Sequence, residues 1–354
     1  MAQNILLSAG GTGGHFFPAV ALAKSLVLEN KTIFLTTDKR CQNYITDDIK
    51  DFTIVQNVTR YRKTPILFIK FAITLAFFIF KNLLFIKRNR IDTVVTFGGY
   101  QALAVLIPAF ILKVPIILNE QNIIAGRTNR LFAKIATKIT VGFRDQKGFE
   151  QFNKKVVFTG IPVRSEFYSV KEKSANEKLK ILVIGGSQGA KFFSELTPKL
   201  LKNLSTQTLK KIDLVQQVKD DDRKDFEYNI SGLPITKNIK AFFTDIAEEI
   251  TNADIVISRS GASTIAELIA AKKPAVFIPY PHAMDNHQYY NAKTLEEMAV
   301  AKIFEEKNLD INSLQKFIEL IVKDKSYLND MIKNYTKNKY ERPVALIGKI
   351  IDKL

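Results

Sequence analysis

The stretch from Asn4 to His15 reads NILLSAGGTGGH, a short apolar run followed by four glycines in five residues. Such a run predicts a buried strand, and the apolar periodicity from Pro18 to Leu28 predicts a helix. Glycines between a strand and a helix let backbone N–H groups approach a ligand, where the helix dipole favours negative charge. The stretch therefore predicts a β–loop–α unit whose loop binds an anionic group.

The same opening recurs in the second half of the chain, where LKILVI at 179–184 precedes GGSQGA at 185–190. Between and after these openings, short apolar strands alternate with longer helical segments, which is typical of parallel βαβ units. The further predicted strands are Thr32–Thr37, Thr93–Phe97, Pro115–Leu118, Asp254–Ser258 and Pro274–Ile278. We expect an α/β protein with domains at 1–162 and 163–340 and a C-terminal helix at 341–354 that packs back on the first domain.

Composition restricts the class of protein. The 354 residues are 46% hydrophobic and 25% charged, as in soluble globular proteins, and the single cysteine, Cys41, allows no internal disulfide. The net charge of +17 is uneven, because residues 1–160 carry 22 basic and 9 acidic side chains while the remainder carries 30 and 26. A basic first half predicts contact with a polyanion, either nucleic acid or an anionic membrane surface.

The longest apolar stretch, from Pro65 to Ile86, is interrupted by Lys70 and Lys81. Its uninterrupted centre is about half of the roughly 20 residues that span a bilayer, so we expect a helix lying on a membrane surface. The alternative is a buried core helix. On the proposed lipid-facing side lie Ile73, Phe77, Phe80 and Leu84, and the flanking cations are Lys63, Lys70, Lys81, Lys87, Arg88 and Arg90.

Further candidate groups follow the predicted strands. His15 can take a proton from an attacking hydroxyl. The loop at 185–190 and the hydroxyl-rich helix start at 258–264 both suit phosphates, so together they favour a nucleotide diphosphate. Glu267 is either a ligand of ribose hydroxyls or the acid of a capping box with Thr264.

Two loops rich in amide groups, NEQN at 119–122 and HAMDNHQ at 282–288, suit sugar hydroxyls; each can also be an ordinary polar loop. The acidic run 220–222 is interpreted as a helix start with solvated charges rather than a metal site. No cysteine and histidine cluster has zinc spacing, and no metal is expected.

Several motifs occur in the order found in one bacterial enzyme family: GGTGGH at 10–15, GGY at 98–100, EQN at 120–122, PVR at 162–164, GGSQGA at 185–190, RSGA at 259–262 and QYYNA at 288–292. On these motifs the chain resembles the MurG family of N-acetylglucosaminyltransferases over essentially its whole length. It departs from the family at Asn119, where His is more frequent, at Ile161, where Asn is frequent, and at Ala102 and Ala104, which replace the usual Ser and Pro.

The resemblance implies a GT-B fold, two Rossmann-like doubly wound domains whose parallel sheets face a central cleft. It implies inverting transfer of N-acetylglucosamine from UDP-N-acetylglucosamine (UDP-GlcNAc) to lipid I, undecaprenyl-diphosphate-linked N-acetylmuramyl pentapeptide, which gives lipid II. The first domain would bind the acceptor and the membrane, and the second UDP-GlcNAc, without a cofactor or an essential metal. Location at the cytoplasmic face of the inner membrane, binding to anionic phospholipid, and partners among other cell-wall synthesis or division proteins are implied as well.

The resemblance also implies roles for individual residues. His15 is the candidate base, beside an acceptor loop formed by Thr12, Gly13 and Gly14. For the donor, Arg164 and Ser187 would bind the diphosphate, Phe242 and Phe243 the uracil, Asn122 and Gln288 the sugar, and Ala262, Ser263, Thr264, Ile265, Ala266 and Glu267 the ribose and diphosphate.

Three other functions are alternatives to this transferase. A UDP-GlcNAc 2-epimerase shares the expected architecture and donor but has no need of the apolar, basic segment at 60–90. A nucleic-acid-binding protein would explain the positive charge, yet no nucleic-acid-binding motif is present in the sequence. Nucleic acid is therefore not expected as a partner. An NAD-dependent dehydrogenase would use Asp38 on the ribose, but the chain lacks G-x-G-x-x-G at its first glycine loop.

Overall fold

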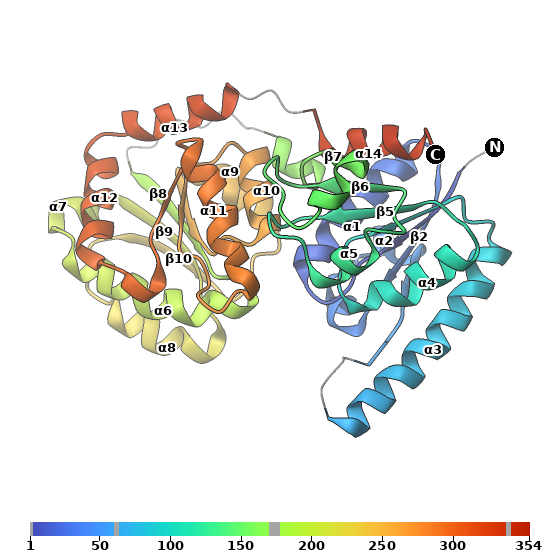
Figure 1. Cartoon of the computed structure of the whole chain (residues 1–354). Coiled ribbons are helices and arrows are strands. Elements are labelled where there is room, and N and C mark those ends of the chain that lie inside the picture. The colour runs from blue at the N-terminus through green and yellow to red at the C-terminus, as the bar shows by residue number, and fades with distance from the viewer. Residues whose placement is uncertain (1–2, 60–63, 170–177, 338–340) are drawn as a thin grey trace. The chain divides into compact units, whose positions relative to one another are not determined.

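The computed structural model describes residues 3–59, 64–169, 178–337 and 341–354, with the side chains of 186–190 excepted. The chain divides into two compact units (Figure 1). The first comprises Met1–Arg164 and Tyr340–Leu354, and the second comprises Ser165–Lys339. Each unit contains a parallel sheet of its own.

The first unit is built on a sheet of order β3-β2-β1-β4-β5-β6-β7, in which all neighbours are parallel. Its strands are β1 (Asn4–Ser8), β2 (Thr32–Thr37), β3 (Thr53–Val55), β4 (Thr93–Thr96), β5 (Ile116–Glu120), β6 (Lys138–Val141) and β7 (Val156–Phe158). Its helices are α1 (Gly13–Leu28), α2 (Asp47–Lys50), α3 (Pro65–Arg88), α4 (Leu103–Ile111), α5 (Arg127–Phe132) and α14 (Pro343–Ile351), with 3-10 turns η1 (Lys39–Tyr44), η2 (Tyr100–Ala102) and η3 (Glu150–Lys155).

Strand β1 is buried on both faces because helices cover both sides of the sheet. Ile5 and Leu7 belong to a core cluster with side chains of α1 and α14. Leu6, which points to the opposite face as alternate strand residues do, belongs to a second cluster with α3 and α4. Two apolar layers thus enclose the sheet, as expected for parallel strands.

Helix α3 lies on the outside of this unit. Of its 24 residues, all of them described, only Asn82 and Ile86 are buried. Asn82 exchanges two hydrogen bonds with the Gln56 amide, at 2.7 and 3.0 Å, and donates to the Ala104 carbonyl at 2.8 Å. The core-helix alternative is therefore wrong. By length and composition alone, α3 could cross a membrane, but this buried amide pair attaches one side of it to the domain.

Helix α14 brings the end of the chain back to the first unit. Ile347 and Ile351 are fully buried in the cluster that contains α1. Beside them, the Lys31 ammonium lies 2.5 Å from the Asp352 carboxylate. The last helix thus completes a core begun by the first strand.

The second unit contains a parallel sheet of order β10-β9-β8-β11-β12-β13. Its strands are β8 (Leu179–Ile184), β9 (Ile212–Gln217), β10 (Thr236–Lys240), β11 (Ile255–Ser258), β12 (Ala275–Phe277) and β13 (Ala301–Ile303). Its helices are α6 (Gly186–Asn203), α7 (Thr206–Lys210), α8 (Asp220–Asn229), α9 (Ile246–Asn252), α10 (Ala262–Ala270), α11 (His287–Glu297), α12 (Ile311–Lys323) and α13 (Ser326–Thr336), with 3-10 turns η4 (Ser165–Tyr168), η5 (Met284–Asn286) and η6 (Glu306–Asn308).

The α/β class is confirmed, and the strand predicted at Thr32–Thr37 is observed at those residues as β2. The first helix, predicted from Pro18, instead begins at Gly13, and Pro18 lies inside it. The two glycines and His15 form the first turn instead, so His15 belongs to the helix rather than to the loop.

Candidate functional site

Topology places a candidate site in each unit. In the first sheet β1 lies between β2 and β4, and in the second β8 lies between β9 and β11. The strand order therefore reverses beside β1 in the first sheet and beside β8 in the second. Open α/β sheets bind ligands at such a reversal, at the carboxyl ends of the strands. The glycine-rich segments at 10–14 and 185–189 follow β1 and β8, and in both the helix has already begun, at Gly13 and at Gly186.

The first glycine loop is held by a buried carboxylate. Gly11, at φ +99°, donates its N–H to Asp38 Oδ2 at 2.8 Å. The same carboxylate accepts from Arg40 at 2.6 Å and from the Gln101 amide at 3.2 Å. Arg40 also donates to the Tyr100 hydroxyl at 3.2 Å, so residues after β1, β2 and β4 meet here. The dehydrogenase alternative predicted that Asp38 binds a ribose. Its carboxylate instead holds this loop in place.

His15 lies in the first turn of α1, after Thr12, Gly13 and Gly14. The Thr12 carbonyl accepts its N–H at 3.2 Å, and Thr12 is the residue that caps the helix. Its ring Nδ1 lies 2.9 Å from Gln121 Oε1, at the end of β5. A side chain at Gly98, whose φ is +88°, would place its Cβ 3.4 Å from Cε1 of the ring. The predicted base and acceptor loop are thus brought together at the carboxyl end of β1.

The predicted sugar-binding loop at 119–122 is mostly structural. Asn119, Glu120 and Gln121 are buried. Glu120 accepts the N–H groups of Asn122 and Gly126 at 3.0 and 2.8 Å. Of the four residues, only Asn122 retains partial exposure, and it remains the candidate for contact with a sugar.

Arg164 is the last residue of the first part of the first unit. Its guanidinium lies over the Phe17 ring, 5.1 Å from the centroid, so an aromatic side chain of α1 fixes its position. Ser187 falls within α6, and its side chain lies outside the described residues.

In the second unit, β11 ends at Ser258 and α10 begins at Ala262, after the cap residue Gly261. The cap residue is Gly261, so Thr264 stands inside the helix and the capping-box interpretation of Glu267 is wrong. Ala262, Ile265 and Ala266 are buried and seat the helix, whereas Ser263, Thr264 and Glu267 are partly exposed. These three are the members of the predicted 262–267 set that can meet a ligand through their side chains.

Gln288 is anchored at the start of α11. Its Oε1 accepts the Tyr280 N–H at 2.9 Å, and its backbone carbonyl accepts the Ser260 hydroxyl at 2.8 Å. After β10, Phe243 is buried while Phe242 is 65% exposed. Of these two, only Phe242 has a ring that is exposed enough to contact a base.

Arg259 belongs to the motif RSGA at 259–262, but no role was predicted for it. It is buried, donates to the Ile278 and Pro279 carbonyls at 3.0 and 3.2 Å, and lies 2.5 Å from Glu306. Its guanidinium also stacks on Phe192, 4.5 Å from the centroid. An arginine directly after a buried strand was the available signal, and its partners lie too far along the sequence to be foreseen.

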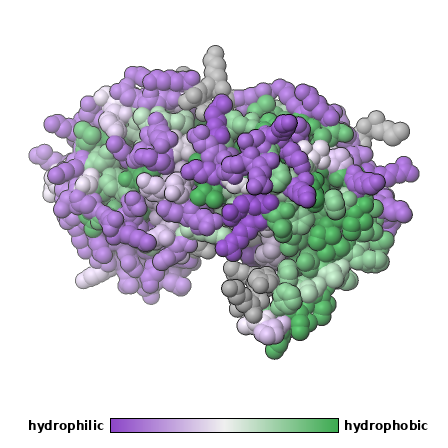
Figure 2. All heavy atoms as spheres, in the orientation of Figure 1, coloured by the Kyte–Doolittle hydropathy of each residue, from purple (hydrophilic) through white to green (hydrophobic). Residues whose placement is uncertain are grey.

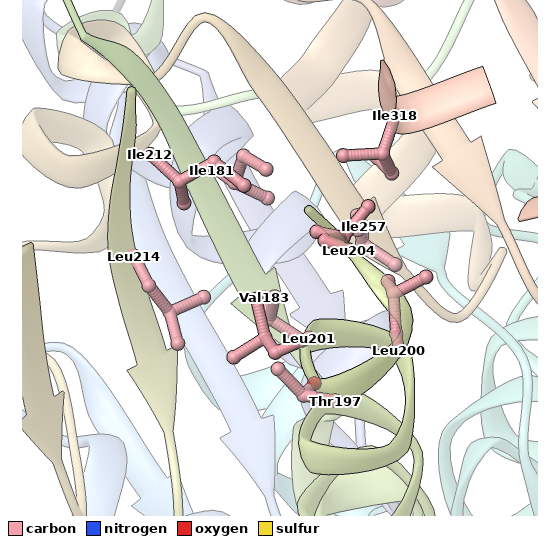
Figure 3. A pocket seen from close by; sticks show the side chains of 10 residues that line it. All are labelled: Ile181, Val183, Thr197, Leu200, Leu201, Leu204, Ile212, Leu214, Ile257 and Ile318. Atoms are coloured by element: carbon pink, nitrogen blue, oxygen red, sulfur yellow. The ribbon is translucent and has the colours of Figure 1, made fainter. Parts of the chain in front are cut away.

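A metal site and a core cavity were also considered as functional sites. Among the described residues, no group of three or more His, Cys, Asp or Glu could hold a metal ion. In the second unit a cavity of about 20 Å³ lies between the sheet and α6 (Figure 3). Nine aliphatic side chains and Thr197 line it, so it is a small gap in the core rather than a substrate site.

Comparison with known proteins agrees with this topology. Residues 5–141 match the glycosyltransferase family 28 N-terminal domain, and residues 180–345 match the glycosyltransferase family 28 C-terminal domain. Proteins from Rickettsia prowazekii (strain Madrid E) and Rickettsia bellii (strain RML369-C) are 36% and 37% identical to this chain. Each match covers 99% of this chain and 99% of the relative. Both are named UDP-N-acetylglucosamine--N-acetylmuramyl-(pentapeptide) pyrophosphoryl-undecaprenol N-acetylglucosamine transferase.

Among solved structures, Acinetobacter baumannii MurG superposes with a TM-score of 0.78 at 26% identity, covering 99% of this chain and 100% of that one. A UDP-GlcNAc 2-epimerase from Neisseria meningitidis has a TM-score of 0.69 at 12% identity over 99% of this chain and 100% of that one, which shows a shared fold alone. The expected Rossmann-like domains are confirmed by these likenesses. Since the two Rickettsia proteins match this sequence from end to end, the chain belongs to the MurG family of N-acetylglucosaminyltransferases, within glycosyltransferase family 28.

Proposed function

We propose that this protein transfers N-acetylglucosamine from UDP-GlcNAc to lipid I and produces lipid II for peptidoglycan synthesis. The observation that carries this function is 36% identity over 99% of both chains to a relative named for that reaction. The glycine loops at the strand-order reversals of both sheets support it, because each offers helix N-terminal amides to a diphosphate. Residues 1–162 would bind lipid I, and residues 163–340 would bind UDP-GlcNAc.

The chemistry is a direct displacement. The acceptor sugar hydroxyl attacks the anomeric carbon of N-acetylglucosamine and forms the new C–O bond. The bond from that carbon to the UDP oxygen breaks, and UDP leaves with the electron pair. His15 takes the hydroxyl proton, and configuration at the anomeric carbon inverts. Thr12, Gly13 and Gly14 would hold the lipid diphosphate while this occurs.

Negative charge develops on the leaving UDP, and fixed donors would stabilise it. Arg164, Ser187 and the start of α10 at Ala262–Thr264 are the proposed donors, while Phe242 and Phe243 hold the uracil. Glu267, with Ile265 and Ala266 seating its helix, would accept the ribose hydroxyls, and Asn122 and Gln288 the sugar. Losing one well-placed donor typically costs about 2.7–4 kcal/mol of transition-state stabilisation. Because these groups supply positive potential themselves, we propose turnover without an essential metal.

A transfer assay tests the function. Labelled UDP-GlcNAc and a short-chain lipid I analogue should give labelled lipid II analogue, with an unchanged rate in the presence of chelator. A loss of rate on chelation would contradict the metal-free proposal alone. Omitting the acceptor distinguishes the epimerase, which would still convert UDP-GlcNAc. Absence of label in the lipid product would refute the transfer.

The second part of the proposal is attachment to an anionic membrane through α3, and we propose the cytoplasmic face of the inner membrane as its location. Large apolar side chains of α3 are 50–70% exposed: Ile66, Phe68, Ile69, Ile73, Phe77, Phe80 and Leu84. Phe110 and Ile111 of the neighbouring α4 add to them, and Figure 2 shows a continuous hydrophobic area over these two helices. Contiguous exposed apolar patches mark sites that contact a membrane or another protein.

Exposed cations accompany the apolar face, among them Lys70, Lys81, Lys87 and Arg88. An apolar face beside basic side chains is the pattern of helices that lie in a lipid headgroup layer. Lys63, expected among these cations, lies outside the described residues. Cell-wall synthesis or division proteins remain further proposed partners, and nucleic acid is not among them.

Vesicle sedimentation tests the membrane attachment. The double variant Ile73→Asp/Phe77→Asp should bind vesicles of anionic phospholipid at least about tenfold more weakly, because two charges would enter the apolar layer. The control Tyr228→Asp changes an aromatic residue of α8 that is 81% exposed, and it should bind like the parent. Equal binding of the α3 variant and the parent would refute the attachment, without bearing on the transfer reaction.

A further inference from the structure

The imidazole of His15 stands at one end of a chain of buried amide and hydroxyl groups. Gln121 Oε1 lies 2.9 Å from His15 Nδ1. The Gln121 amide nitrogen donates to Asn119 Oδ1 at 2.7 Å, and Asn119 Nδ2 donates to the Thr140 hydroxyl at 2.8 Å. That hydroxyl in turn lies 3.4 Å from the Leu118 carbonyl. Asn119, Gln121 and Thr140 are all buried, so water does not compete for these groups.

Backbone carbonyls fix the direction of this chain. Gln121 Nε2 lies 2.9 Å from the Asn119 backbone oxygen, which can only accept a hydrogen bond. Turning the Gln121 amide over would put its oxygen against that carbonyl and against Asn119 Oδ1 together. The nitrogen of Gln121 therefore faces Asn119, and the oxygen of Gln121 faces His15.

We infer that Gln121 is a positioning residue that holds His15 with its proton on Nδ1 and leaves Nε2 as the proton acceptor. An amide oxygen has no proton to give, so the His15 Nδ1 must donate in the 2.9 Å contact. No hydrogen bond to His15 Nε2 occurs among the described residues. In free histidine the neutral ring prefers the opposite tautomer, with the proton on Nε2.

The arrangement also suits turnover. When Nε2 takes up a proton, Nδ1 keeps its own and still donates to Gln121, so no buried group must reorient. Asn119 is the second positioning residue, because its side chain and carbonyl orient Gln121. The catalytic meaning of the tautomer rests on the proposed function, whereas the tautomer itself does not.

The ring nitrogens can be observed directly by ¹⁵N NMR of histidine-labelled full-length protein, above the pH at which the rings are charged. The chain has three histidines, and His15→Gln would assign the signals of His15. His287 supplies an internal reference for the Nδ1–H form, because its Nδ1 lies 2.7 Å from the Met284 carbonyl. His282, which is exposed, supplies a solvent-facing reference.

In the parent, His15 should match His287, with a protonated Nδ1 and an unprotonated Nε2. Gln121→Met preserves side-chain volume and removes the acceptor, so the Nε2–H form should appear and kcat should fall about tenfold or more, as expected for a base in the wrong tautomer. The KM for UDP-GlcNAc should stay within about twofold, because the donor contacts are untouched. The matched control Gln151→Met, at an exposed position in η3, should leave the His15 tautomer, kcat and KM unchanged.

An Nε2–H ring in the parent would overturn the inference, and that measurement needs no variant to fold. An unchanged tautomer in Gln121→Met would overturn it as well. If the parent failed to transfer N-acetylglucosamine, the proposed function would fall while the NMR result still decided the tautomer.

Discussion

His15 is the residue on which the proposed chemistry depends most. His15→Ala should lower kcat by about 10²–10⁴-fold, the usual contribution of a positioned general base. The KM for UDP-GlcNAc should be little changed, because the donor is assigned to other residues. Steady-state transfer kinetics measure both constants. A turnover within about threefold of the parent would remove His15 from the base role.

Cys41 offers a test of the packing beside the first glycine loop. It is fully buried in the core shared with α1, and burial raises the pKa of its thiol. Since the thiolate is the reactive form, a raised pKa leaves less of it at neutral pH, and labelling should accelerate only as pH rises beyond the range of a free thiol. At pH 8 a thiol reagent should react about tenfold or more slowly with the native protein than with the protein in guanidinium. Equal rates would show that this core is open.

At this scale the sequence supplied candidate residues but not the contacts that support them. His15 and the glycine loops could be predicted, because they follow strands in a local pattern. Asp38 and Gln121 could not be given their roles, since their partners Gly11 and His15 lie 27 and 106 positions away. Only the fold brings these pairs together.

Among the elements, α3 is attached to the first unit through the amide pair of Asn82 and Gln56. Asn82→Leu should lower the free energy of unfolding by about 1–3 kcal/mol, because it leaves the buried Gln56 amide without its partner. The double variant Asn82→Leu/Gln56→Leu should lose less free energy of unfolding than the two single variants lose in sum. Asn153→Leu, the same change at an exposed position, should stay within about 0.5 kcal/mol. Urea denaturation measures all four, and strict additivity would contradict the coupling.

The cavity below α6 permits a second stability test. Leu200→Ala would enlarge a gap that already exists, so it should lower the free energy of unfolding by about 2–5 kcal/mol. Val183→Ile adds one methylene at the same gap and should change stability by less than about 1.5 kcal/mol. A cost below about 1 kcal/mol for Leu200→Ala would mean that the site collapses around the loss.

The strands that were predicted all lie inside the sheets, no edge strand was predicted, and the interior strands β6 and β9 were missed as well. The buried run Thr32–Thr37 gives β2 at those residues. The edge strand β10, which reads TKNIK and is largely exposed, carries no apolar pattern by which it could be recognised. Likewise β3 spans only three residues, too few for a period to be read.

For the whole molecule, sequence order and spatial membership disagree at α14. Ile347→Ala should destabilise the first unit by about 2–5 kcal/mol, although residue 347 follows the second unit in the chain. Hydrogen exchange should show lost protection in peptides of β1 and unchanged protection in β8. The matched variant Ile318→Ala, fully buried in α12, should give the opposite pattern. Loss of β8 protection in Ile347→Ala would refute this separation of the two units.

The charge difference between the halves and the paired βαβ openings were visible in the sequence. The final helix was expected to pack on the first domain, but no residue pattern identifies its partner in the core, because α14 resembles any other short apolar helix.

That return has a consequence for biosynthesis. A ribosome adds the residues of α14 only after the whole of the second unit, so the first unit cannot complete its core while translation continues. The flank of α1 that α14 covers stays open until the nascent polypeptide leaves the exit tunnel. The N-terminal unit of a nascent molecule therefore stays exposed to chaperones and proteases throughout translation, although it is synthesised first.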